Sequence, residues 1–129
     1  MLRPRIFPVL LINNGSLVKT VQFASPKYLG DPINAVRIFN EYEVDELCIY
    51  DISIENLINW KLLESISNEC QMPVTYGGNV RSVVDAIKLV ELGFEKVSIS
   101  TSVIESPQLI EEFCKEIGSQ SVVLTLDVK

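Results

Sequence analysis

Short apolar runs alternate with longer amphipathic segments along the whole chain. Short apolar runs bounded by turn residues are typical of buried strands. The expected strands are residues 5–12, 46–50, 74–76, 96–100 and 121–127. Residues 17–23 alternate apolar and polar side chains, and this pattern predicts an outer hairpin strand that Ser25-Pro26-Lys27 closes.

Four helices are expected between these strands, and their ends carry capping residues. The predicted helices span residues 32–43, 56–70, 82–92 and 107–118. Asp31 and Pro32 start the first helix, because aspartate accepts bonds from free helix amides and proline fits the first helical position. Gly93 suits the C-terminal cap of the third helix.

Buried strands joined by single helices predict an α/β fold in which helices cover a parallel sheet. Right-handed crossovers leave two architectures, an open doubly wound sheet or part of a barrel. Periodicity does not choose between them, but a weak repeat between residues 45–51 and 95–101 favours the barrel. Five parallel strands and four helices are half of a (βα)8 TIM barrel, which needs about 250 residues. We expect a single half-barrel domain over residues 1–129.

The amino-acid composition of the chain argues against several classes of function. A net charge of −6 argues against a sequence-independent nucleic-acid binder. No apolar run approaches the roughly 20 residues of a membrane span, so we expect a cytoplasmic protein with no membrane partner. The chain has no histidine and three widely spaced cysteines, for which we expect reduced thiols, no metal site and no cofactor. Proton transfer would fall to carboxylates, lysine, tyrosine or cysteine.

Charged residues stand at the N-terminal ends of three expected strands. They are Arg5, Glu46 and Lys96. Counting by twos along the first strand places Arg5, Phe7, Val9 and Leu11 on one face. If all three charged side chains point inward, they form a charged ring at the bottom of the barrel. The alternative is that each is an ordinary solvated residue at the start of a strand.

The C-terminal strand ends carry Asp51, Gly77-Gly78, Ser100-Thr101 and Asp127. Ligands of α/β proteins bind at this edge. A glycine pair lets the backbone approach a ligand, and amides at a helix start can hold phosphate, although simple turn geometry also explains two glycines. Thr101 could add a hydroxyl.

Two further residues are candidates at the same edge. Lys19 can reach over it as a charge for a phosphate or carboxylate, or it is a solvated lysine of the hairpin. Asp127 is the best carboxylate for acid–base work. The matching position on the first strand is Leu11, so Asp127 has no carboxylate partner.

These residues resemble the N-terminal half of the cyclase subunit of imidazole glycerol phosphate synthase over essentially the whole chain. The matching segments are Arg5-Ile6 with Pro8, Leu17-Val18-Lys19, Gly30-Asp31-Pro32, Val44-Asp45-Glu46-Leu47, Asp51-Ile52, Gly77-Gly78 with Arg81-Ser82, and Glu95-Lys96-Val97-Ser98-Ile99. The resemblance implies a barrel that takes ammonia from a glutaminase partner for a lyase and cyclisation reaction of histidine biosynthesis.

The resemblance also implies roles for single residues. Arg5, Glu46 and Lys96 correspond to a gate through which ammonia enters the barrel. The phosphate site of the first half corresponds to Gly78, the backbone at Asn79, and Thr101, while Lys19 matches a lysine of the active-site loop and Asp127 one of two catalytic aspartates.

Two departures limit the implied activity. The other catalytic aspartate falls at Leu11, which cannot carry a proton, and the third glycine of the phosphate turn is Asn79. Leu10-Leu11 and Gly30-Asp31-Pro32 look closer to a paralogous branch that acts with a glutaminase-like partner and an amidotransferase to form amidino groups on bacterial surface-polysaccharide sugars. The second phosphate site of the cyclase belongs to the other half of the barrel. We therefore expect no cyclase turnover from this chain alone.

A half-barrel leaves an apolar interior face open. We expect Phe7, Val9, Leu11, Val97 and Ile99 on that face, and we expect a homodimer or higher oligomer to cover it. Three function classes remain: a phosphate-binding half-barrel that takes a phosphorylated small molecule, an ammonia-channelling subunit with a glutaminase, and a self-associating structural module without a ligand.

Overall fold

The computed structural model is built around a single mixed β-sheet. It describes residues 4–5, 7–21, 24–53, 57–100 and 107–125. The strand order is β3-β2-β1-β4-β5-β6-β7. Five strands run parallel: β1 (Val9–Asn13), β4 (Leu47–Asp51), β5 (Val74–Gly77), β6 (Lys96–Ser100) and β7 (Val122–Thr125). The strands β2 (Ser16–Val21) and β3 (Ala24–Gly30) extend the sheet antiparallel at the β1 edge.

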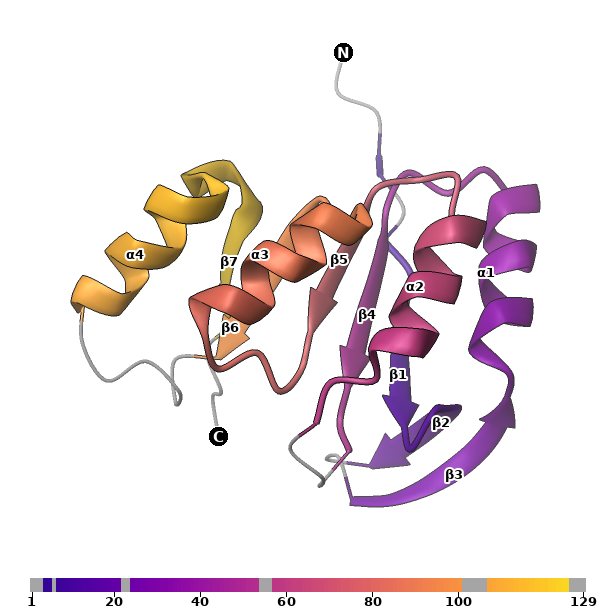
Figure 1. Ribbon diagram of the computed structural model, residues 1–129. Coiled ribbons are helices and arrows are strands. Elements are labelled where there is room, and N and C mark those ends of the chain that lie inside the picture. The colour runs from indigo at the N-terminus through magenta and orange to yellow at the C-terminus, as the bar shows by residue number, and fades with distance from the viewer. Residues whose placement is uncertain (1–3, 6, 22–23, 54–56, 101–106, 126–129) are drawn as a thin grey trace.

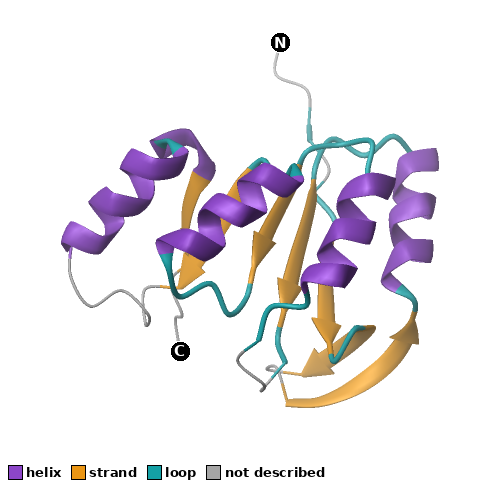
Figure 2. Ribbon diagram, viewed as in Figure 1, coloured by secondary structure: helices purple, strands orange, loops and turns teal. Residues whose placement is uncertain are grey.

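All four predicted helices form, and they lie together on one face of the sheet (Figures 1 and 2). They are α1 (Pro32–Glu41), α2 (Trp60–Glu69), α3 (Val83–Leu92) and α4 (Pro107–Ile117), and a short 3-10 turn follows at Ser119–Ser121. The side chain of Asp31 accepts from the Ile33 amide at the start of α1, and Gly93 adopts a φ of 114° at the end of α3. Both expected caps are thus confirmed.

Two details of the predicted elements are wrong. Ser25, Pro26 and Lys27 lie within β3 rather than in a turn. Proline is tolerated there because β3 is the edge strand of the sheet. Helix α2 begins at Trp60, because the Asn59 side chain caps it by accepting from the Leu62 amide.

Alternate side chains along each parallel strand enter the core between the sheet and the helices. The buried strand residues on this face are Leu10, Ile12, Leu47, Ile49, Val74, Tyr76, Val97 and Ile99. They pack against helix residues such as Val36, Leu63, Ile66, Leu89 and Phe113. The Tyr76 and Phe94 rings contact at 5.9 Å between centroids. This side is a closed apolar core.

Among the residues that the structure describes, no helix covers the other face of the sheet (Figure 1). Phe7 and Val9 are 46% and 55% exposed, in agreement with the predicted alternation along β1. The expectation that Val97 and Ile99 share this face is wrong, because they are 0% and 1% exposed under the helices. Strand alternation then leaves Ser98 and Ser100 on the open face with Lys96. The β6 part of the open face is therefore polar rather than apolar.

The β1–β2 turn is tied to the connection that follows β4. Asn14 and Gly15 adopt φ values of 50° and 80°, as expected for an Asn-Gly hairpin turn. The Asn14 amide donates to the Ser53 Oγ at 2.9 Å. The Ser53 amide and hydroxyl both donate to Oδ1 of Asp51. Ser53 therefore links the hairpin to the carboxyl end of β4.

Within the described part of the chain, no helix is both long enough and apolar enough to cross a membrane.

We predict that Ser53→Ala loosens the hairpin turn without unfolding the protein, because it removes the acceptor of the Asn14 amide. The Asn14 amide should exchange with solvent at least about tenfold faster, which corresponds to about 1.4 kcal/mol for one lost hydrogen bond. Hydrogen exchange followed by NMR measures this rate. Ser65→Ala is the control, since the Ser65 hydroxyl bonds only within α2 to the Lys61 carbonyl. Equal protection of Asn14 in both variants would contradict the link.

Candidate functional site

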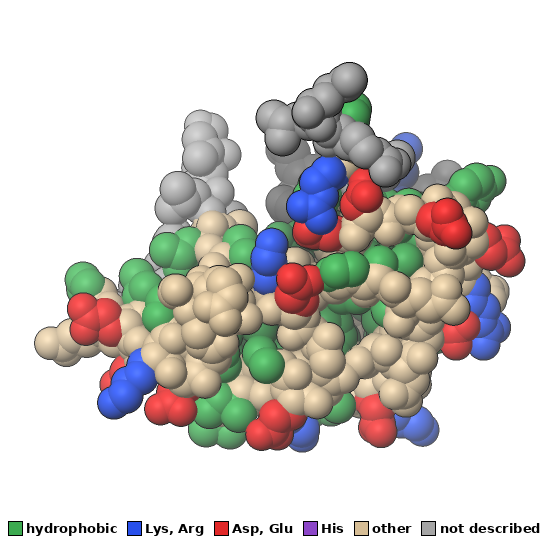
Figure 3. All heavy atoms as spheres, turned by 90° about the horizontal axis from the view of Figure 1, so that it is seen from above, with side chains coloured by type: hydrophobic (Ala, Val, Ile, Leu, Met, Phe, Trp, Pro, Cys, Tyr) green, Lys and Arg blue, Asp and Glu red, His purple; other side chains and the backbone are tan. Residues whose placement is uncertain are grey.

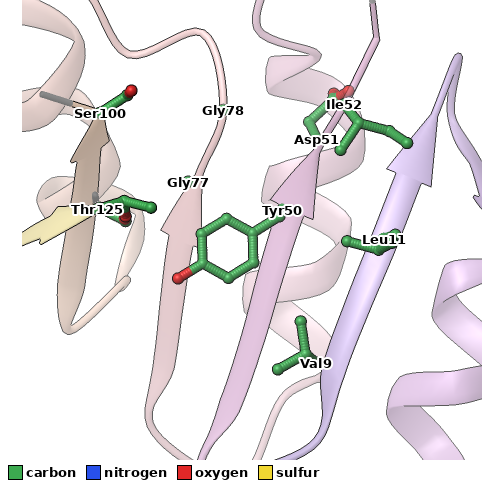
Figure 4. Close-up of a pocket in the computed structure, with 10 residues that line it drawn as sticks. Val9, Leu11, Tyr50, Asp51, Ile52, Gly77, Gly78, Ser100 and Thr125 are labelled. Atoms are coloured by element: carbon green, nitrogen blue, oxygen red, sulfur yellow. The ribbon is translucent and has the colours of Figure 1, made fainter. Parts of the chain in front are cut away.

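A cavity of about 430 Å³ lies on the open face, toward the carboxyl ends of the parallel strands (Figure 4). Its lining comes from β1, β4, β5, β6 and β7. The residues are Val9, Leu11, Tyr50, Asp51, Ile52, Gly77, Gly78, Ser98, Ser100 and Thr125. This is the edge at which the sequence predicts a ligand, and the predicted positions Leu11 and Gly78 both line it.

The absence of side chains at the end of β5 shapes the cavity. A Cβ atom on Gly77 would lie 2.5 Å from Cε1 of Tyr50, so the Tyr50 ring rests directly against the Gly77 backbone. Figure 4 shows this ring reaching from β4 across to β5. Gly78 has a φ of 121°, and a Cβ atom there would lie 2.4 Å from the Asp51 carbonyl oxygen. Packing of the β5 turn against the β4 backbone thus requires glycine at position 78, and glycine at position 77 leaves room for the Tyr50 ring.

The turn after β5 has two successive residues with positive φ, Gly78 and Asn79, and it has a structural role. Asn79 adopts a φ of 58°, a left-handed conformation that asparagine tolerates. The side chain of Ser82 then caps α3 by accepting from the Asp85 amide at 3.2 Å. The contact between Gly78 and Asp51 accounts for the glycine without a ligand, so the phosphate role of Gly78 and Asn79 stays a prediction.

The three remaining predicted site residues are Lys19, Thr101 and Asp127. Lys19 is exposed and lines a second hollow of about 280 Å³, to which Val9 and Leu11 also contribute. It therefore lies beside the main cavity. Thr101 and Asp127 lie outside the described residues, two positions or fewer beyond Ser100 and Thr125, which line the cavity.

Sequence reasoning missed Tyr50 and Ser98 as cavity residues. Both follow from counting by twos, because Tyr50 shares a face with Glu46, and Ser98 shares one with Lys96. The Ser98 and Thr125 hydroxyls are hydrogen-bonded to each other. The cavity is therefore apolar and aromatic on its β1 and β4 side and hydroxyl-bearing on its β6 and β7 side.

The opposite end of the sheet brings charged residues together. Arg5 Nη2 donates to Glu46 Oε1 at 2.6 Å, with Glu46 buried and Arg5 largely exposed. The Arg5 guanidinium also lies 5.3 Å from the centre of the Phe7 ring. Figure 3, which views the molecule from this end, shows acidic and basic side chains interspersed among hydrophobic ones. Burial of Glu46 is compensated by this short ion pair.

The charges that act on Cys48 show that Lys96 lies in the same region as Glu46. Burial and the Glu46 carboxylate raise the pKa of the Cys48 thiol, while a hydrogen bond with Thr75 and the positive charge of Lys96 oppose that rise. The strand register sets Cys48 beside Thr75 and Thr75 beside Lys96. Arg5 and Glu46 are thus in contact near the starts of β1 and β4, while Lys96 begins β6, on the other side of β5. The role of these three residues as an ammonia gate stays a prediction.

The remaining described thiols do not suggest a catalytic nucleophile or a metal centre. Burial, together with the Glu69 carboxylate, raises the pKa of Cys70 to about 11. Cys48, Cys70 and Cys114 are all free. Among the residues that the structure describes, no group of three histidine, cysteine or acidic side chains could hold a metal ion.

The relatives found by comparison with known proteins carry similar names. The chain is 48% identical to a subunit from Leptospira borgpetersenii and 48% identical to one from Vibrio vulnificus strain YJ016. It is 47% identical to a third from Pseudomonas aeruginosa. Their names, provisional in each case, are imidazole glycerol phosphate synthase subunit HisF, hisF3 and hisF2. Each alignment covers 100% of this chain and 52%, 51% and 53% of the relative, so the chain spans about half the length of these relatives.

The family model described as histidine biosynthesis protein matches residues 5–129, which is nearly the whole chain. The members of that family are TIM barrels, and five parallel strands with four helices on one face are the arrangement expected of half such a barrel. This chain therefore belongs to the histidine biosynthesis protein family and forms half of its (βα)8 barrel.

Proposed function

We propose that this half-barrel relative of the cyclase subunit binds phosphate, or the phosphate of a small molecule, at the carboxyl ends of its strands. The observation that carries the proposal is the cavity that opens there, with Gly78 in its lining and Asn79 next in the turn. Thr101 and Lys19 are the side chains proposed to add a hydroxyl and a positive charge. Phosphate sites at this edge are common in (βα)8 barrels.

We further propose that the chain alone does not catalyse the cyclase reaction. Leu11 lines the cavity at the position where the resembled family has a catalytic aspartate. Asp127, the other proposed acid–base residue, therefore has no carboxylate partner on β1. One carboxylate can still hold a proton, but a paired acid and base are needed to take a proton and return it on two sides of a substrate.

We predict that inorganic phosphate shifts the NMR amide signals of Gly78, Asn79 and Thr101 and leaves those of α1 unchanged. Thr101→Val should weaken phosphate binding about tenfold, because a hydrogen bond to a charged group contributes about 1.5–3 kcal/mol. Ser65→Ala, on the exposed side of α2, is the control. Phosphate-induced shifts spread evenly over the surface, or none at all, would contradict the proposal.

A second function is supported by the charged cluster at the other end of the sheet. The ion pair of Arg5 with Glu46, and the positive charge of Lys96 acting on Cys48, support an entrance at the N-terminal end of the open face. We propose that a glutaminase delivers ammonia through this entrance, either for a reaction of histidine biosynthesis or for an amidination of surface-polysaccharide sugars. A cavity lined mostly by apolar and hydroxyl-bearing residues would take neutral ammonia more readily than ammonium.

We predict that this chain raises the rate of glutamine hydrolysis by the glutaminase subunit of an imidazole glycerol phosphate synthase, and that Lys96→Ala abolishes the stimulation. The reason is that Lys96 is part of the proposed entrance. Lys115→Ala, in the last turn of α4, is the matched control and should stimulate like the unaltered chain. A glutaminase assay with purified proteins measures the rates. Equal stimulation by both variants would rule out a role for Lys96.

The open face also supports association of two copies, as expected from the sequence. Val9 is 55% exposed on it, and β3 and β7 are unpaired at the two edges of the described sheet. Exposed apolar patches and free strand edges favour pairing with another chain. If neither phosphate nor a glutaminase binds, the self-associating structural module is the function that remains.

We predict a dimer or larger oligomer at micromolar concentration in sedimentation velocity, and a monomer for Val9→Asp. The variant places a charge in the apolar contact that association would bury. Val84→Asp is the control, because Val84 is 72% exposed on α3, on the helical face. A stable monomer for the unaltered chain would exclude self-association through the open face.

A further inference from the structure

The turn between β1 and β2 contains the only Asn-Gly pair in the sequence, Asn14 and Gly15. Asn13 pairs with Ser16 across the turn, so Asn14 and Gly15 are the two residues outside the strand ladder. Asn14 is exposed, and Gly15 has no side chain to shield its backbone nitrogen. The side-chain amide of Asn14 is therefore open to water and next in the chain to an unhindered backbone nitrogen.

A polar hollow of about 240 Å³ lies beside this turn, and both turn residues line it. Ser53 and Asn59 also line the hollow, and Asp51 supplies the one carboxylate among its described lining residues. A Cβ atom on Gly15 would lie 3.6 Å from Nδ2 of Asn59, so the turn rests close to the start of α2. The hollow gives the turn polar neighbours and a single nearby negative charge.

We infer that the Asn14–Gly15 turn is a site of spontaneous covalent modification, and that its hydrogen bond to Ser53 sets the rate. The Gly15 backbone nitrogen bonds to Cγ of Asn14, the bond between Cγ and Nδ2 breaks, and the side-chain nitrogen takes up the Gly15 proton and leaves as ammonia. Water then opens the resulting cyclic imide at either carbonyl. Opening at Cγ gives aspartate, and opening at the backbone carbonyl gives isoaspartate, in which the main chain runs through Cβ.

Closure of the imide competes with the hairpin turn. The ring fixes the backbone torsion that joins Asn14 to Gly15, so the turn has to open locally before the ring can form. The Asn14 amide donates to the Ser53 Oγ at 2.9 Å, and the Ser53 hydroxyl donates to Oδ1 of Asp51. Loss of the bond to Ser53 should raise the opened population, and with it the modification rate, about tenfold, which corresponds to about 1.4 kcal/mol.

The modification changes the turn and the hollow together. Either product adds a carboxylate to the hollow that already contains the carboxylate of Asp51, and like charges repel. Isoaspartate also adds an atom to the main chain inside the turn, which disturbs the pairing of Asn13 with Ser16. We therefore expect β2, the strand that carries Lys19, to be held less tightly against β1 in the modified chain.

Incubation of the chain in mildly alkaline buffer, followed by peptide mapping with mass spectrometry, tests the inference. Asn14 should lose its side-chain amide first, well before Asn34, which is exposed on α1 and is followed by alanine. Ser53→Ala should accelerate the loss at Asn14 about tenfold, whereas Ser53→Thr keeps the hydroxyl and should stay slow. Ser65→Ala is the matched control, because the Ser65 hydroxyl bonds to the Lys61 carbonyl within α2.

Hydrogen exchange at the amides of β4 and β5 shows whether each variant is folded. If Ser53→Ala does not fold, the unaltered chain in concentrated urea takes its place, because urea removes the turn and should accelerate the loss at Asn14. The modified chain, separated by anion exchange through its extra negative charge, should exchange its β2 amides faster than the fresh chain. An intact Asn14 after Asn34 has reacted, or rates at Asn14 that neither Ser53→Ala nor urea increases, would overturn the inference.

Discussion

The close approach of β4 and β5 at their carboxyl ends is the contact on which the candidate site depends. Two successive residues of β5 and its turn lack side chains, and each leaves room for a different part of β4. Gly77 makes room for the Tyr50 ring, and Gly78 for the backbone of Asp51. The Asp51 carboxylate accepts a hydrogen bond from the Ser53 hydroxyl, and that hydroxyl accepts one from the Asn14 amide of the hairpin turn. A side chain at position 77 would displace the Tyr50 ring, whereas one at position 78 would displace the Asp51 backbone, to which the hairpin is tied through Ser53.

The two ends of the open face have opposite chemistry, and their separation follows from strand alternation. At the N-terminal end, a buried carboxylate is matched by the Arg5 guanidinium at 2.6 Å, with Lys96 nearby. At the carboxyl end, the described cavity residues are mostly apolar or hydroxyl-bearing. Ions are expensive to bury without a partner, so the buried Glu46 carboxylate requires the Arg5 guanidinium beside it.

Much of the fold could be predicted from local signals in the sequence. The Asp31 and Gly93 caps and the apolar runs located the helices and the five parallel strands within a few residues. Strand β3 was missed because Pro26 is a turn signal in sequence, whereas only the sheet order shows that this strand is at an edge, where proline costs no ladder hydrogen bond. Val97 and Ile99 were placed on the wrong face because apolar character was given more weight than alternation from Lys96. The Tyr50–Gly77 contact joins two separate strands, so it required the register of β4 and β5.

Leu11 and Tyr50 are best understood as a pair. They lie side by side in register on the open face, so a carboxylate at position 11 would stand against the phenol ring rather than in open solvent. The carboxylate of Asp51 already accepts hydrogen bonds from the amide and hydroxyl of Ser53, which in turn bonds to the hairpin turn. An aspartate at position 11 would therefore stand beside the ring of Tyr50. Position 11 therefore cannot be considered apart from the Tyr50 wall of the cavity, because the two side chains lie in register on β1 and β4.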